Sequence, residues 1–106
     1  MNGGKMGKML KQMQKVQAEM LKLQEDVNSR TVEASSGGGA VRAVVSGAKE
    51  LVELHIDPEL LKEEDVEMVQ DLIMGAVNEA IRVADKMANS EMQKLSGSLG
   101  LPKDLL

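Results

Sequence analysis

Apolar residues near the start of the chain recur at alternating intervals of three and four positions. Between residues 6 and 27 they are Met6, Met9, Met13, Val16, Met20, Leu23 and Val27, and we refer to these residues as the seam. This is the spacing of the a and d positions of a heptad repeat, so it predicts one long amphipathic helix with an apolar face. At about 1.5 Å per residue the helix is about 33 Å long, and one end is expected to project beyond a small domain.

The following segment alternates every second residue, as β-strands do. We predict strands over residues 30–35, 40–46 and 51–56. Three consecutive glycines, residues 37–39, predict a hairpin loop with positive φ angles between the first two strands. A phosphate-binding loop would need a helix after the glycines, whereas here a strand follows. The second strand has apolar residues on both faces, which predicts burial on both sides, and the three strands together predict an antiparallel meander.

Asp57 and Pro58 favour a short helical turn through Leu61, because Asp is a common N-cap and Pro suits the first helical position. A second long helix is predicted from about residue 64, with acidic side chains near the positive end of its dipole. Consecutive carboxylates point around a helix rather than toward one ion, so we predict no metal site there. The acidic residues are Glu63, Glu64, Asp65 and Glu67.

The second helix carries its apolar residues in one broad stripe that is expected to cover the sheet. An alanine recurs at every fourth position from residue 76 to residue 88, and this smooth ridge predicts close packing. Gly97 and Gly100 are expected to end the helix.

The predicted fold class is therefore α+β, in a single domain over residues 1–106. Its order is a long N-terminal helix, a three-stranded antiparallel sheet, a short helical turn and a long C-terminal helix. Residues 1–5 and 96–106 are expected to be flexible.

The chain contains no Phe, Tyr, Trp or Cys, and its one histidine is His55. The missing aromatic rings argue against binding single-stranded nucleic acid by stacking bases on them. We interpret His55 as a surface or structural residue beside Asp57, and we expect no metal site, no cofactor, no small-molecule substrate and no enzymatic activity. No segment is long and apolar enough to cross a membrane and no export signal is recognisable, so a cytoplasmic location is expected.

Charge is segregated along the chain, whose formal net charge is −4. Residues 1–22 contain five lysines and a single acid, Glu19, for a net charge of +4, whereas residues 23–106 carry −8. Exposed charges interact over a Debye length of about 8 Å at physiological salt. The basic end can therefore attract a polyanion although the whole chain is acidic.

Lysines on the first helix repeat on a face different from the seam and form a basic stripe. Such lysines are commonly solvated surface residues, which is the alternative interpretation. Their segregation on one projecting helix favours contacts with phosphates instead. The candidate DNA-binding residues are Lys5, Lys8, Lys11, Lys15 and Lys22, with Arg82, Lys86 and Lys94 on the last helix as an additional set.

A chain of 106 residues without aromatics must bury one face of each helix and a two-sided apolar strand. We infer a homodimer in which both subunits complete the core. The alternative is that the seam packs against the C-terminal helix of its own chain.

Several segments, taken in their order and spacing, resemble the YbaB/EbfC family of bacterial nucleoid-associated proteins. They are MGKMLKQMQKVQ (residues 6–17), SSGGGAVRAVVSG (residues 35–47), LHIDPELL (residues 54–61), the acidic helix start and the GLP of residues 100–102. The resemblance implies a tweezer-shaped homodimer that binds double-stranded DNA through protruding helices and affects nucleoid organisation and gene expression. It also implies a bacterial, cytoplasmic location on the nucleoid, and it brings no catalytic residues. DNA contacts transfer to the candidate lysines by position and charge only.

The leading hypothesis is a dimeric, non-enzymatic protein that binds DNA phosphates with weak or broad sequence preference. The alternative is a protein-interaction or assembly factor that uses the seam to bind a helical partner. The salt dependence of duplex binding separates the two hypotheses.

Overall fold

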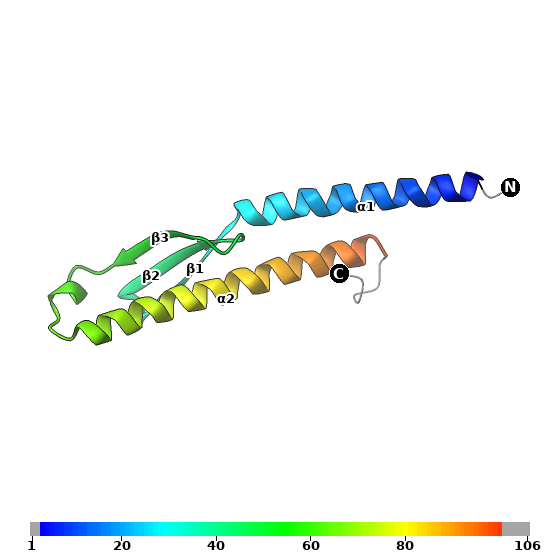
Figure 1. Ribbon diagram of the computed structural model, residues 1–106. Helices are drawn as coiled ribbons and strands as arrows, with labels where there is room; N and C mark the ends of the chain where they lie inside the picture. Colours follow the sequence, from blue (N-terminus) through cyan, green and yellow to red (C-terminus); the bar gives the residue numbers. More distant parts are fainter. Residues whose placement is uncertain (1–2, 101–106) are drawn as a thin grey trace.

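The computed structural model describes residues 3–100. In chain order its elements are α1 (Gly3–Ser29), β1 (Thr31–Ser36), the 3-10 turn η1 (Gly37–Gly39), β2 (Val41–Ser46), β3 (Leu51–Ile56), the 3-10 turn η2 (Leu60–Lys62) and α2 (Val66–Ser98). This order confirms the predicted α+β class. The molecule is elongated, with extents of 78 × 20 × 17 Å. The sheet lies toward one end, and α1 and the last part of α2 extend side by side from it (Figure 1).

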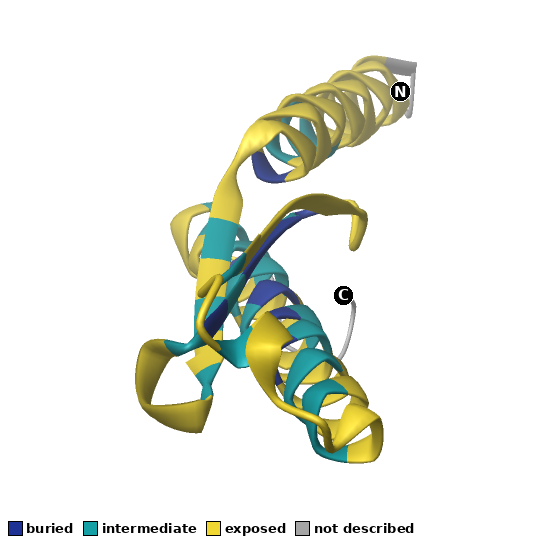
Figure 2. Cartoon of the chain, turned by 90° about the vertical axis from the view of Figure 1, so that its left-hand side faces the viewer, coloured by how far each residue is buried: buried dark blue, intermediate teal, exposed yellow. Residues whose placement is uncertain are grey.

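Helix α1 begins at Gly3 and ends at Ser29, so it is longer at both ends than its pattern predicts. Residues 3–5, for which the sequence predicts flexibility, are the first residues of this helix. Residues 1 and 2 lie outside the described part of the chain. Burial in α1 is confined to the part nearest the sheet (Figure 2).

Helix α2 begins at Val66, later than predicted, because Asp65 caps it. The Asp65 side chain accepts a hydrogen bond from the Met68 backbone N–H at 3.0 Å, which satisfies one of the free amides of the first turn. Glu63 and Glu64 therefore precede the helix, although the sequence places them in its first turns.

The other end of α2 also differs from its prediction. The helix continues past Gly97 to Ser98, so the first residues of the predicted flexible tail are helical. Ser96 is only 1% exposed. Residues 101–106 lie outside the described part of the chain.

The sheet is an antiparallel meander in the order β1-β2-β3, as predicted. Its first hairpin turns through the three glycines, whose φ angles of 60°, 66° and 96° lie in the region that favours glycine. The prediction of a glycine hairpin with positive φ is confirmed. The second turn ends at Lys49, which has a φ of 66° despite its side chain.

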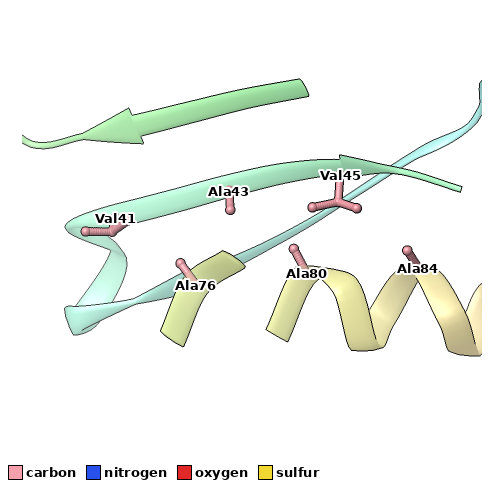
Figure 3. Packing of buried hydrophobic residues seen from close by; sticks show 6 residues of the cluster. All are labelled: Val41, Ala43, Val45, Ala76, Ala80 and Ala84. Carbon is pink, nitrogen blue, oxygen red and sulfur yellow. The ribbon is translucent and has the colours of Figure 1, made fainter. Parts of the chain in front are cut away.

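The core lies between β2 and α2. Val41, Ala43 and Val45 of β2 are fully buried against the alanine ridge of α2, of which Ala76, Ala80 and Ala84 are also fully buried (Figure 3). Small side chains on the helix allow its backbone to approach the sheet closely. The ridge prediction is confirmed for these three alanines.

Strand β3 departs from the expectation that α2 covers the whole sheet. Helix α2 packs against β1 and β2, whereas Leu51, Val52 and Leu54 of β3 are 48%, 56% and 38% exposed. One helix is about 10 Å wide and strands are about 4.8 Å apart, so a single helix covers two strands. The predicted two-sided burial of β2 is supported by Val44, which lies on the face away from α2 and is 9% exposed.

Candidate nucleic-acid interface

The first half of α1 projects from the body of the molecule, and we call residues 3–15 the arm. Every arm side chain that the structure describes is exposed. Met6, Met9 and Met13 of the seam are 63%, 62% and 57% exposed, although they are apolar. From Val16 onward the seam becomes half-buried, and it ends in Val27, which is 3% exposed.

Helix α1 is attached to the rest of the chain through its last turns, where it contacts α2 and β2. Val27 lies against Gly47, the residue that follows β2. A Cβ atom at Gly47 would lie 1.9 Å from the Val27 carbonyl oxygen, so only glycine fits there. The heptad pattern predicts that Val27 belongs to the seam, but it does not reveal this close approach.

The five candidate lysines of α1 share one side of the helix. At 3.6 residues per turn they fall within an arc of about 120°. All five are exposed, and none has a carboxylate within ion-pair distance among residues 3–100. Their full positive charge is therefore available to a ligand. The residues are Lys5, Lys8, Lys11, Lys15 and Lys22.

The additional candidates on α2 lie in a different electrostatic setting. The Arg82 guanidinium lies 2.7 Å from a Glu79 carboxylate oxygen, and the Lys94 ammonium lies 3.2 Å from one of Glu91. Lys86 is exposed and has no ion pair within the described range. Both pairs have i,i+3 spacing, which is a signal already present in the sequence. Two of the three additional candidates are therefore partly neutralised.

The arm and the segment around η2 lie at opposite ends of the molecule (Figure 1), and they carry opposite charge. The segment of residues 57–71, around η2 and the start of α2, contains seven acidic residues and one lysine. Since the molecule is 78 Å long and the Debye length is about 8 Å, this acidic end does not screen the arm. The segregation seen along the sequence is thus a segregation in space.

The one histidine of the chain, His55, lies on β3. His55 Nε2 lies 2.9 Å from Glu53 Oε2, and the His55 side chain is 50% exposed, as expected of a surface residue. The hydrogen bond and charge of His55 lower the pKa of the Glu53 carboxyl below its usual range. Among residues 3–100 there is no group of three or more His, Cys, Asp or Glu residues arranged to bind a metal ion. No helix in that range is long and apolar enough to span a membrane.

The comparison with known families decides how this arrangement is classified. Residues 1–99 match the model of the YbaB/EbfC DNA-binding family. The chain belongs to this family. The resemblance carried by the sequence segments is thereby confirmed.

Similar proteins in the family cover almost the same length. A nucleoid-associated protein of Pelotomaculum thermopropionicum is 53% identical over 102 residues, which are 96% of this chain and 97% of that protein. A nucleoid-associated protein of Ruminiclostridium cellulolyticum is 53% identical over 98 residues, 92% of this chain and 85% of the relative. The crystal structure of the uncharacterized protein HP0035 from Helicobacter pylori superimposes with a TM-score of 0.70 at 28% identity, covering 90% of this chain and 97% of that one.

Proposed function

We propose that this protein binds double-stranded DNA through the basic stripe of α1 and acts as a nucleoid-associated protein. The observation that carries the proposal is the set of five exposed lysines, without ion pairs among residues 3–100, on a projecting helix of a member of a DNA-binding family. The names of the relatives support the nucleoid as its location in the cell.

The stripe suits the DNA backbone better than the base edges. Lysine is a flexible point charge that binds phosphate without base information. Lys8 and Lys15 are separated along the helix axis by about 10 Å, and one DNA strand carries a phosphate about every 3.4 Å of its axis, so this part of the stripe spans about three phosphates. Binding of this kind is broad in sequence preference and decreases steeply as salt concentration rises.

A titration of fluorescent duplex DNA at two salt concentrations tests this proposal. We expect an affinity that falls as salt rises and that differs little between unrelated duplex sequences. Binding that does not change with salt would show that phosphate contacts are not its basis. A strong preference for one duplex would show that base contacts or DNA shape contribute to binding beyond the phosphate contacts.

We also propose that the protein forms a homodimer through the apolar surface that α2 leaves uncovered. Leu54 pairs with Ala43, and Ala43 packs against α2, so Leu54 lies on the same side of the sheet as α2 yet remains 38% exposed. Leu51 likewise pairs with the core residue Val45 and is 48% exposed.

One flank of α2 lies next to β1, because the hydroxyl of Ser36, at the end of β1, donates a hydrogen bond to the Leu72 carbonyl. The opposite flank of α2, toward β3, is apolar as well. It carries Met74, which is 54% exposed, and the half-buried Ile81. Lys49, in the turn that leads into β3, forms an ion pair of 2.8 Å with Asp85 of α2. The face of β3 that carries Leu51 and Leu54, together with the flank of α2 that carries Met74 and Ile81, forms one apolar surface. In the proposed homodimer, the α2 helix of the second subunit packs on this surface.

Light scattering tests the homodimer and its surface. We expect twice the chain mass for the unmodified protein, and the chain mass for Leu54→Asp and for Met74→Asp. Leu61→Asp is the matched control, because Leu61 is 64% exposed outside this surface. A monomer at micromolar concentration would contradict the homodimer, and a dimer that persists in both variants would place the interface elsewhere.

A second candidate function rests on the exposed end of the seam. Met6, Met9 and Met13 leave an apolar stripe on the arm, and methionine-rich faces adapt to varied helical partners. A protein-interaction or assembly factor would lose its partner on Met→Gln substitution of these residues. Duplex binding that survives Lys→Glu substitution of the stripe would show that the stripe is not the DNA-contacting surface, whereas loss of duplex binding would favour DNA binding through the stripe.

A further inference from the structure

The connection between α1 and the sheet consists of very few residues. Helix α1 ends at Ser29 and β1 begins at Thr31, so Arg30 is the single residue between them. All three are exposed, and we call residues 29–31 the joint. The direction of the arm is set here and by the contacts of the last turns of α1.

Both backbone groups of Arg30 are bonded, each to a different element. Its N–H donates to the Val27 carbonyl in the last turn of α1 at 3.1 Å. Its carbonyl accepts a hydrogen bond of 2.9 Å from the N–H of Gly47, the residue that follows β2. The peptide groups on both sides of the Arg30 Cα are thereby fixed to the helix and to the sheet.

The side chain of Arg30 connects the same helix to α2. Its Nη2 atom lies 2.6 Å from Asp26 Oδ2 on α1, and its Nη1 atom lies 3.2 Å from Glu91 Oε1 on α2. The side chains of Arg30 and Glu91 are 42% and 18% exposed, so water screens this contact less than it screens the other ion pairs among residues 3–100, the Lys94–Glu91 pair included. A planar guanidinium can bond two carboxylates at once, which an ammonium group does less well.

Lys94 approaches the same oxygen of Glu91, at 3.2 Å, but it lies on α2 itself. The hydrogen bond of Lys94, and after it the charges of Lys94 and Arg30, lower the pKa of the Glu91 carboxyl below its usual range. Among the cations around Glu91, Arg30 alone links α1 to α2 in the part of the chain that the structure describes.

We propose that Arg30 is a positioning residue that sets the angle of the DNA-binding arm by linking Asp26 of α1 to Glu91 of α2. This inference rests on the proposed function, because the arm is the part of the molecule to which DNA binding is assigned. A small rotation at the joint has a large effect at the tip. Helix α1 has 27 residues and is about 40 Å long, so a rotation of about 10° moves its tip by about 7 Å. That displacement is about twice the axial spacing of phosphates on one DNA strand.

Apolar contacts also attach the arm, and they predict a different response to substitution. Val27 and the half-buried part of the seam pack against the body regardless of charge. If they alone set the arm direction, Arg30→Gln leaves that direction unchanged. If the Arg30 bridge sets it, Arg30→Gln and Glu91→Gln change it in the same way.

Pulsed electron paramagnetic resonance measures the arm directly, without DNA. The chain has no cysteine, so Gln12→Cys on the arm and Gln70→Cys on α2 accept spin labels at those sites only. Labelled protein is diluted with unlabelled protein so that distances within one chain dominate. We expect a narrow distance distribution that broadens in Arg30→Gln and in Glu91→Gln and stays narrow in the control Lys94→Gln. Unchanged distributions in both test variants would overturn the proposal.

Duplex affinity supplies a second readout that separates positioning from charge. Glu91→Gln makes the protein more positive, so a pure charge effect strengthens DNA binding. A positioning effect weakens it about two- to fivefold, since the competent arm direction is less populated. The slope of binding against salt is expected to stay unchanged, because the lysines remain. Tighter binding by Glu91→Gln, or a lower salt slope in Arg30→Gln, would show that charge or a direct phosphate contact explains the role of Arg30. If the protein fails to bind DNA at all, the proposed function is wrong while the distance measurement still tests the joint.

Discussion

Replacing Lys8, Lys11 and Lys15 with glutamine should reduce the salt sensitivity of duplex binding strongly. The three side chains are exposed, lie on one side of the arm and have no carboxylate partner within the described part of the chain. Each phosphate contact contributes about 0.9 to the slope of log affinity against log salt, so the slope should fall by about 2.7 for each arm that contacts DNA. Between 50 and 200 mM salt, the unmodified protein should therefore lose about 40-fold more affinity than the variant does for each arm that contacts DNA.

The assay is a fluorescence anisotropy titration of one duplex at four or more salt concentrations. The matched comparison is Arg82→Gln with Lys86→Gln and Lys94→Gln, which removes the same charge from α2. Its effect on the slope should be smaller, because Arg82 and Lys94 already have carboxylate partners. Equal changes of slope in the two triple variants would refute the assignment of the contacts to the arm. Unfolding curves of both variants show whether the fold is intact.

Three further predictions concern stability. Gly47→Ala should destabilise the protein by about 3 kcal/mol or more in urea unfolding, because no room exists for a Cβ atom, whereas the control Gly97→Ala on α2 has open space and should stabilise it by about 0.5–1 kcal/mol. Ala80→Leu should lower the free energy of unfolding by about 1–3 kcal/mol through overpacking of a fully buried site, and an unchanged melting temperature would contradict the close approach of α2 to β2. Lys94 and Arg30 lower the pKa of the Glu91 carboxyl, so the ionised carboxylate stabilises the fold at neutral pH, and this stabilisation is lost as pH falls below about 4.3. Glu91→Gln should therefore flatten the pH dependence of thermal unfolding in that acidic range.

Periodicity predicted the elements of this fold because it records which residues face the same side of a helix or strand. The three-and-four spacing of the seam predicted α1, and the alternation of apolar and polar residues predicted the three strands. The consecutive glycines predicted a hairpin with positive φ. Helix ends were predicted less well. Asp65 caps α2 through a hydrogen bond to Met68, and a cap depends on local geometry that apolar spacing does not record.

The basic stripe was predictable as well, because the spacing of lysines along a helix determines whether they lie on the same face. Partial neutralisation of Arg82 and Lys94 was also visible in the sequence, as carboxylates three residues earlier. The membership of the chain in a DNA-binding family agrees with that pattern. Which of these cations contact DNA stays a prediction.

The sequence by itself determined the element order, the alanine ridge, the separation of charge along the chain and the stripe on α1. Only the tertiary structure showed that the first part of the seam is exposed, that α2 covers two strands and leaves β3 open, and that Gly47 lies against Val27. It alone brought Arg30 and Glu91, 61 positions apart in the sequence, into contact. The physical reason is that periodicity is a local property of a helix or strand, whereas exposure and ion pairing between elements depend on how far one element reaches across another.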